Sequence, residues 1–294
     1  MTASSSGWTT VARLDARRVV DALRTRGTRL VVEGPCPGGQ VGAAYVRWEE
    51  DGRRGVLKWR PGTSVTAART GALAVVEALR HTGYPAPATD LVAQLGDAVV
   101  TVQELLPGTS PDPLTPAHLD QLLRLNHSQA DLLAAHPRIP AAALHLRDDG
   151  PGFCLHEPLR HHSPRTAALE RRISALADRY PPSLPGNDAV HYDFHPGNLL
   201  TTGPDITGVI DWDGAARGDR HFDLVTLRFG LHAANASPAV TDRLDALLAT
   251  LPDRILTPAW AHMSLRLTDW TIRHPTPSGP TPTSWLDLAD RYVP

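Results

Sequence analysis

Lysine is nearly absent from this sequence. Lysine and arginine together number 29, yet Lys58 is the only lysine, so the remainder of this set is arginine. The two side chains are not equivalent, because guanidinium is a wide planar fork whereas ammonium is a compact point charge that fits between two phosphate oxygens. A phosphate site would therefore keep lysine where arginine is preferred elsewhere. Chance retention of a solvated residue is the other interpretation of Lys58.

Other features are scarce as well, and each scarcity excludes a class of protein. The two cysteines, Cys36 and Cys154, lack metal-type spacing, which predicts free thiols rather than a disulfide framework or a structural zinc site. No apolar run approaches the roughly 18 residues of a membrane span, and the first residues lack the apolar core of a signal peptide. A net charge of −2 leaves no basic surface for nucleic acid. We expect a cytoplasmic protein without a nucleic-acid or membrane partner.

The first hundred or so residues have the pattern of a small antiparallel sheet with one helix. Asp51-Gly52 and Gly96-Asp97 each separate two strand-like runs, as in tight hairpins. Lys58 falls late in the third strand. A short helix is indicated over 11–26, and the main helix of this region over 64–82, where apolar residues recur at helical spacing.

The rest of the chain is predicted to be mainly helical. A connector rich in proline and glycine, about 103–114, separates an N-terminal lobe (1–106) from a C-terminal lobe (107–294). Thr115-Pro116 and Ser163-Pro164 suit the first turns of helices, the former running to about residue 135. Further helices are expected near 221–233, 238–249, 258–274 and 284–291.

One strand-rich insert in the helical half concentrates polar groups. "HYDFHPGNLL" followed by "VIDWD" presents Asp193, Asn198 and Asp211 from the ends of short strands toward a shared cleft. Phosphoryl transfer requires a carboxylate for the attacking hydroxyl, oxygen ligands for magnesium and a cation on the phosphates. Lys58 would supply that cation.

These motifs resemble the aminoglycoside phosphotransferase and choline kinase family. The pattern H-x-D-x-x-x-x-N is met by His191, Asp193 and Asn198, and "IDWD" is similar to the family's metal-binding motif. "GDRHFDL", with Asp219 and Asp223, is similar to the family's continuation. The resemblance implies an α+β, protein-kinase-like bilobal fold with a small antiparallel-sheet lobe and a larger helical lobe.

The resemblance also implies roles for individual residues. Asp193 would be the catalytic base or hydroxyl-orienting residue, Asn198 and Asp211 would hold Mg2+, and Lys58 would bind the α- and β-phosphates of ATP or GTP. His191 would support the loop. Asp213 would either support the loop or approach a second metal ion.

Other nucleotide contacts are predicted from individual residues of the N-terminal lobe. Glu77 is the one acid in the first lobe's helix that could pair with Lys58, although it lies late in that helix. Gly38 and Gly39 would let the backbone approach the phosphates. Gln103 and Leu105 would contact the base through their backbone, which leaves ATP and GTP equally open.

The resemblance implies an acceptor site in the helical lobe. Glu157, Asp269 and Trp270 are candidates to line a pocket for a hydroxylated, cationic molecule. The family resemblance, together with a composition of the GC-rich kind common in antibiotic producers, favours an aminoglycoside or another basic antibiotic, such as a tuberactinomycin peptide. A housekeeping kinase of choline, homoserine or a sugar is the alternative within the same chemistry.

Two further classes stay open. A metal-dependent hydrolase could gather His191, Asp193, His195 and Asp211 around zinc or manganese. A ligand-binding pseudokinase would keep the fold and lose the chemistry. A hydrolase would leave Asn198, Lys58 and the sheet lobe unexplained. The intact set of Asp193, Asn198, Asp211 and Lys58 argues against a pseudokinase.

Overall fold

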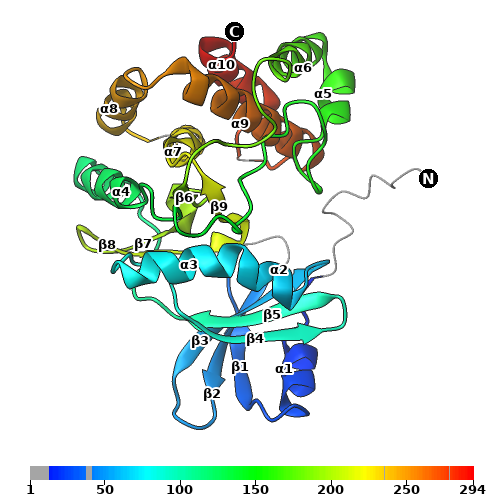
Figure 1. Ribbon diagram of the computed structural model, residues 1–294, viewed down its shortest axis with the longest axis vertical. Coiled ribbons are helices and arrows are strands. Elements are labelled where there is room, and N and C mark those ends of the chain that lie inside the picture. The colour runs from blue at the N-terminus through cyan, green and yellow to red at the C-terminus, as the bar shows by residue number, and fades with distance from the viewer. Residues whose placement is uncertain (1–12, 38–41, 235, 278) are drawn as a thin grey trace.

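The computed structural model describes residues 13–37, 42–234, 236–277 and 279–294. Figure 1 shows an antiparallel sheet with short helices at one end of the molecule and a helical bundle at the other. The expected α+β, kinase-like bilobal fold is confirmed. In the part of the chain that the structure describes, no helix combines the length and the apolar character that crossing a membrane requires.

The N-terminal sheet has five strands in the order β1-β2-β3-β5-β4, each antiparallel to its neighbour. Gly52 and Gly96 have positive φ angles of 74° and 62°, as the two predicted hairpin turns require. The strands are β1 (Leu30–Pro35), β2 (Ala43–Trp48), β3 (Arg54–Pro61), β4 (Thr89–Leu95) and β5 (Ala98–Glu104).

Helices cover both faces of this sheet, where the sequence indicated one short helix and one main helix, and the main helix is divided in two. α1 (Ala16–Arg24) packs its apolar side on the face that carries Leu57. On the opposite face the chain forms α2 (Val65–Thr70) and α3 (Ala72–His81). Gly71 separates them because its angles, φ −114° and ψ −116°, lie outside the helical region.

The apolar side of α3 belongs to the core of the C-terminal lobe. Val75, Val76 and Leu79 are buried in that core, and α3 lies between the sheet and the bundle in Figure 1. The bundle consists of α4 (Pro116–Ser128), α5 (His156–His162), α6 (Pro164–Leu176), α7 (His221–Ala233), α8 (Pro238–Leu248), α9 (Asp253–Arg273) and α10 (Pro282–Tyr292).

Several helices differ from the sequence expectation. α4 ends at Ser128 instead of near 135, and the following turns place Asp131 at a positive φ of 52°. α9 starts at Asp253, five residues before the expected start, because it accommodates Pro258 within its second turn. The segment around His156 was not among the expected helices, yet it forms α5, and the His156 ring bonds to the buried Glu170.

The predicted polar insert lies on two small antiparallel ribbons between the lobes. β6 (Asp188–Val190) pairs with β9 (Ala216–Gly218), and β7 (Leu199–Thr202) pairs with β8 (Asp205–Val209). Two short 3-10 turns, η2 (Pro196–Asn198) and η3 (Trp212–Gly214), flank the second ribbon. α3 contacts η3 and β9, so this helix lies against the insert.

Candidate active site

Lys58 reaches the C-terminal lobe from the centre of the sheet. Leu57 points into the core beneath α1, so Lys58 points to the opposite face, where it is paired in register with Thr101. Its Nζ lies 2.6 Å from Oδ1 of Asp211 and 2.7 Å from Oδ2 of Asp213. One ammonium thus joins both acids of the "IDWD" motif.

These ion pairs determine the charge states of the groups involved. Burial lowers the pKa of Lys58, but the adjacent Asp213 and Asp211 carboxylates more than offset this effect, so its pKa lies above the ordinary lysine value. Burial raises the pKa of Asp213, and the Lys58 ammonium outweighs that effect and holds the pKa below its usual value. Lys58 and Asp213 are therefore charged at neutral pH.

Trp212 places the two aspartates. Its side chain is buried, and its Nε1 donates to the carbonyl of Val209 at 2.8 Å. Asp211, just before it, has a left-handed backbone with φ 66° and ψ 52°. This backbone bend lets Asp211 and Asp213 both reach Lys58 while the indole between them stays in the core.

His191 connects the two motif loops. The backbone N–H of Asp193 donates to its Nδ1 at 3.2 Å, and its Nε2 donates to the carbonyl of Ile210 at 2.8 Å. Burial lowers the pKa of His191 to about 4, so the imidazole is neutral at pH 7. Both ring nitrogens are engaged with backbone groups, which leaves the ring neither to ligate metal nor to transfer protons.

Asp193 lies two residues after His191, in the loop called the catalytic loop below, and its carboxylate is partly exposed. Oδ1 accepts a hydrogen bond from Arg266 Nη2 at 2.9 Å, whereas Oδ2 has only long contacts, at 3.4 Å to Asn198 Nδ2 and 3.6 Å to His195 Nε2. Burial raises the pKa of Asp193, but the Arg266 guanidinium and the neighbouring histidines hold it well below the usual range. Asp193 is thus a carboxylate with one lightly bonded oxygen.

The predicted metal ligands Asn198 and Asp211 each keep a side-chain oxygen without a hydrogen bond among the described residues. Asn198 Nδ2 donates to the backbone carbonyl of Asp193 at 2.9 Å, and the Ile210 N–H donates to the carbonyl of Asn198. Among the described residues no hydrogen bond reaches Asn198 Oδ1 or Asp211 Oδ2. Amide and carboxylate oxygens are the ligands that Mg2+ prefers, so this donor set fits magnesium.

Asp223 supports the catalytic loop from beneath. Its carboxylate accepts the backbone N–H groups of His191 (2.8 Å) and Tyr192 (2.9 Å), and an amide N–H of Gln129 (3.1 Å). Complete burial raises its pKa to about 7. This anchor orients the loop from α7 without contacting the cleft.

Not all predicted nucleotide contacts come together. Glu77 is exposed on α3, and no ion pair joins it to Lys58 among the described residues. Gln103 is buried near the end of β5 and Leu105 follows the strand, so both stay predictions for the base site. Gly38 and Gly39 lie outside the described residues.

One of the three predicted acceptor residues is buried and cannot contact a ligand. Asp269 is completely buried, and its oxygens bond to Arg273 at 2.6 and 2.8 Å and to the Leu155 N–H, so it cannot line an open pocket as expected. Glu157 is exposed at the start of α5, and Trp270 is half-buried with its ring against His274. These last two stay predictions.

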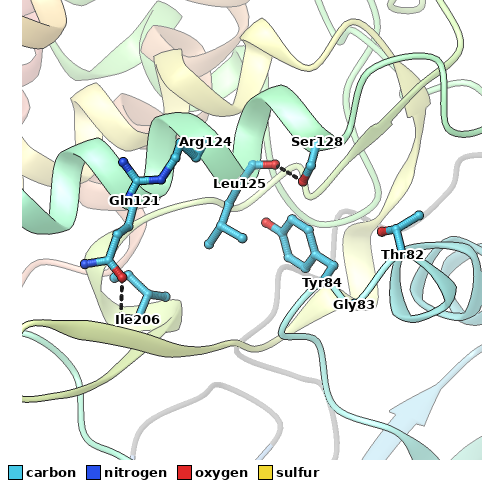
Figure 2. Close-up of a pocket in the computed structure, with 8 residues that line it drawn as sticks. All are labelled: Thr82, Gly83, Tyr84, Gln121, Arg124, Leu125, Ser128 and Ile206. Atoms are coloured by element: carbon cyan, nitrogen blue, oxygen red, sulfur yellow. Dashed lines mark hydrogen bonds between the residues drawn. The ribbon is translucent and has the colours of Figure 1, made fainter.

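The structure also brings in residues that the sequence did not single out. Arg266 on α9 bonds to Asp193, although 73 residues separate them and no motif surrounds Arg266. Tyr84 packs edge-on against Trp212, with ring centroids 5.5 Å apart. Tyr84 also lines a pocket of about 350 Å3 between α4 and the end of α3, shown in Figure 2, which includes no residue predicted for the site.

The hydrolase alternative lacks its ligand cluster. Within the described ranges no group of three or more histidine, cysteine or acidic side chains is arranged to hold a metal ion. The His191 nitrogens are occupied by backbone groups, and Asp193 is paired with Arg266. The two cysteines are free thiols, as predicted.

Comparison with protein families decides the class. The model of a family described as "Phosphotransferase enzyme family" matches residues 34–264, which is most of the chain. The chain belongs to this family. As a member of the phosphotransferase enzyme family, the protein is an enzyme, and the resemblance inferred from the motifs is confirmed. No curated protein matches the sequence significantly.

Solved structures of similar fold include other phosphotransferases. An aminoglycoside phosphotransferase APH(4)-Ia in complex with ADP and hygromycin B is 17% identical, covers 94% of this chain and 97% of its own, and has a TM-score of 0.57. Spectinomycin phosphotransferase APH(9)-Ia with ADP and spectinomycin is 14% identical, with coverages of 95% and 94% and a TM-score of 0.57. The macrolide 2′-phosphotransferase MphH from Brachybacterium faecium is 17% identical, with coverages of 95% and 98% and a TM-score of 0.51. At these low identities, the similarity shows that this member of the phosphotransferase enzyme family has the same fold as the three solved proteins.

Proposed function

We propose that this protein transfers the γ-phosphoryl group of ATP or GTP to a hydroxyl group of a basic antibiotic, such as an aminoglycoside or a tuberactinomycin peptide. The observation that carries the chemistry is the meeting of Lys58, from the sheet lobe, with Asp211 and Asp213 of the helical lobe. The substrate class rests on the similar structures, which were solved with ADP and hygromycin B or spectinomycin.

Each polar group then has a task in the transfer. Asp193 Oδ2 receives the hydrogen bond of the acceptor hydroxyl and orients its oxygen toward the γ-phosphorus. A new P–O bond forms to that oxygen as the bond to the nucleoside diphosphate breaks, and the hydroxyl proton passes to Asp193. Lys58 neutralises the α- and β-phosphates.

Magnesium would be held by Asn198 and Asp211. The ion would neutralise charge on the phosphate oxygens when bound. Asp211 Oδ1 is engaged with Lys58, so the nucleotide phosphates would replace that contact, while Asp213 can keep its own.

The test is a nucleotide-consumption screen with magnesium and either ATP or GTP. The panel contains aminoglycosides, tuberactinomycins, nucleoside antibiotics, choline and homoserine, with mass detection of an added phosphoryl group. We expect one antibiotic to gain a phosphoryl group with the wild type and not with Asp193→Asn. Phosphorylation of choline or homoserine alone would replace the substrate proposal with the housekeeping alternative. Failure to bind magnesium-ADP would reject the chemistry.

A further inference from the structure

Arg266 makes two hydrogen bonds to consecutive residues of the catalytic loop. Its Nη1 donates to the backbone carbonyl of Tyr192 at 2.8 Å, and its Nη2 donates to Asp193 Oδ1 at 2.9 Å. One rigid guanidinium thus connects the carboxylate to the backbone just before it. Such a fork restricts the side-chain rotamer of Asp193 more than a single ion pair would.

The guanidinium is itself fixed. Arg266 extends from α9, which packs against α5 and α7, and only 20% of its side chain is exposed. Its plane lies near the rings of Phe153 and Tyr192, with centroid distances of 5.4 and 5.7 Å. Aromatic faces attract a cation and limit its movement.

The backbone that Arg266 contacts has an unusual conformation. Tyr192 has a φ of 72°, which is rare for an aromatic residue. Asp223 fixes the Tyr192 N–H, and the Tyr192 hydroxyl donates to the carbonyl of Ala143. Strained backbone of this kind persists where surrounding contacts over-determine it, and it is concentrated at functional sites.

The two carboxylate oxygens of Asp193 are therefore not equivalent. Oδ1 is bonded to Arg266, whereas Oδ2 has contacts of 3.4 and 3.6 Å that a stronger hydrogen bond can displace. Given the proposed function, on which this step rests, we propose that Arg266 is a positioning residue that fixes Asp193 through Oδ1 and leaves Oδ2 for the acceptor hydroxyl.

The chain offers a matched control. Arg273, two turns further along α9, also joins a carboxylate and a backbone carbonyl: its guanidinium bonds to Asp269 at 2.6 Å and to the carbonyl of Gly152 at 3.1 Å. It has no contact with Asp193 among the described residues. Arg266→Lys and Arg273→Lys thus remove the same kind of fork from the same helix, and only the first one acts on the catalytic loop.

The experiment measures kcat and the KM for nucleotide in these variants, with thermal unfolding as a check on folding. We expect Arg266→Lys to lower kcat about tenfold and Arg266→Gln to lower it about a hundredfold. The KM for nucleotide should stay within about twofold, because the substitutions disturb the orientation of the acceptor hydroxyl and leave the nucleotide contacts in place. Arg273→Lys should keep kcat within about twofold of the wild type. Equal loss of kcat in the two lysine variants would overturn the proposal, since the loss would then come from disturbed packing of α9 and not from the contact with Asp193.

A double variant tests the route of the effect. In the Asp193→Asn background, Arg266→Gln should change kcat by less than about twofold, because the group that Arg266 positions has already lost its function. A second hundredfold loss in that background would mean that Arg266 acts independently of Asp193 and would overturn the proposal.

A crystal structure of Arg266→Gln separates this inference from the substrate proposal, since it needs no acceptor. We expect the Asp193 carboxylate to leave its present rotamer while Asp223 still bonds to the loop. An unchanged Asp193 rotamer would refute the positioning role even if an antibiotic is phosphorylated. A displaced carboxylate would support it even if the acceptor screen finds none, and Arg266→Lys replaces the variant if Arg266→Gln does not fold.

Discussion

Lys58 Nζ lies 2.7 Å from Asp213 Oδ2, although the two residues belong to different lobes. Glu77, which the sequence suggested as the partner, is exposed on α3. We expect Asp213→Asn to lower kcat/KM for magnesium-ATP about tenfold, or about 1.4 kcal/mol, because the ammonium loses the carboxylate that places it. Glu77→Gln is the control and should stay within about twofold. A greater loss with Glu77→Gln would restore Glu77 as the partner.

Lys58→Arg tests why the chain keeps one ammonium. The substitution retains the charge, but the wider fork cannot fit between the α- and β-phosphates as a point charge. We expect weaker binding of magnesium-ADP by calorimetry and lower turnover, by about tenfold each. Arg60→Lys, on the same strand face two residues further along, serves as the control because it leaves position 58 intact. Unchanged binding and turnover in Lys58→Arg would make the lone lysine an accident of composition.

Asp193→Asn tests the chemical role of the loop. Loss of the carboxylate should remove roughly 3 kcal/mol or more of transition-state stabilisation, or more than about a hundredfold in kcat, because a neutral amide is a weaker hydrogen-bond acceptor and cannot take the hydroxyl proton. Affinity for magnesium-ADP should change little. Asp205→Asn, at an exposed position in the β7–β8 hairpin, provides the comparison. Full activity of Asp193→Asn would refute the assignment.

Local sequence signals predicted the elements that depend on local chemistry. Asp51-Gly52 and Gly96-Asp97 marked the hairpins because positive φ favours glycine. Lys58 falls late in the third strand, as predicted. Pro258 misled the prediction, since a proline that suits a helix start lies inside α9. In the sequence, a proline at the start of a helix looks the same as one inside a helix, and only the packing of the helix distinguishes the two positions.

Long-range pairing could not be read from the sequence. Arg266 and Asp193 are brought together by the packing of α9 on α7, and nothing near Arg266 in the sequence indicates this. Asp269 looked like an acceptor ligand because it is acidic, yet Arg273, one turn away, neutralises it. That i, i+4 spacing was a usable signal for a structural ion pair.

His191 predicts acid sensitivity of the fold. Its pKa is about 4 in the folded protein and near 6.5 in an unfolded chain, so the unfolded state binds the proton more readily. Its contribution to stability is therefore complete above about pH 6.5 and is lost as the pH falls toward 4. Asp223, with a raised pKa of about 7, acts in the opposite direction over the same range, so the wild type alone does not isolate His191.

The comparison of wild type with His191→Gln isolates this effect. The variant should be less stable at pH 7, because the rigid imidazole that joins the Asp193 N–H to the Ile210 carbonyl is lost, and the difference should narrow by about 2 kcal/mol at pH 5. Urea unfolding at both pH values measures the two free energies of unfolding. An equal difference at pH 7 and pH 5 would mean that His191 titrates alike in the folded and unfolded chains.

Tyr84→Phe tests a buried hydroxyl whose ring packs against Trp212 of the "IDWD" motif. Among the described residues the Tyr84 hydroxyl has no hydrogen-bond partner, while its ring packs against Trp212. A buried polar group without a partner costs about 1–3 kcal/mol, so removing the oxygen and keeping the ring should raise the free energy of unfolding by about 1 kcal/mol. Tyr84→Ala should instead lower it by about 3–5 kcal/mol through the cavity it leaves against Trp212. If Tyr84→Phe were less stable than the wild type, the hydroxyl would have a partner in solution, and the adjoining pocket of Figure 2 would be where to seek it.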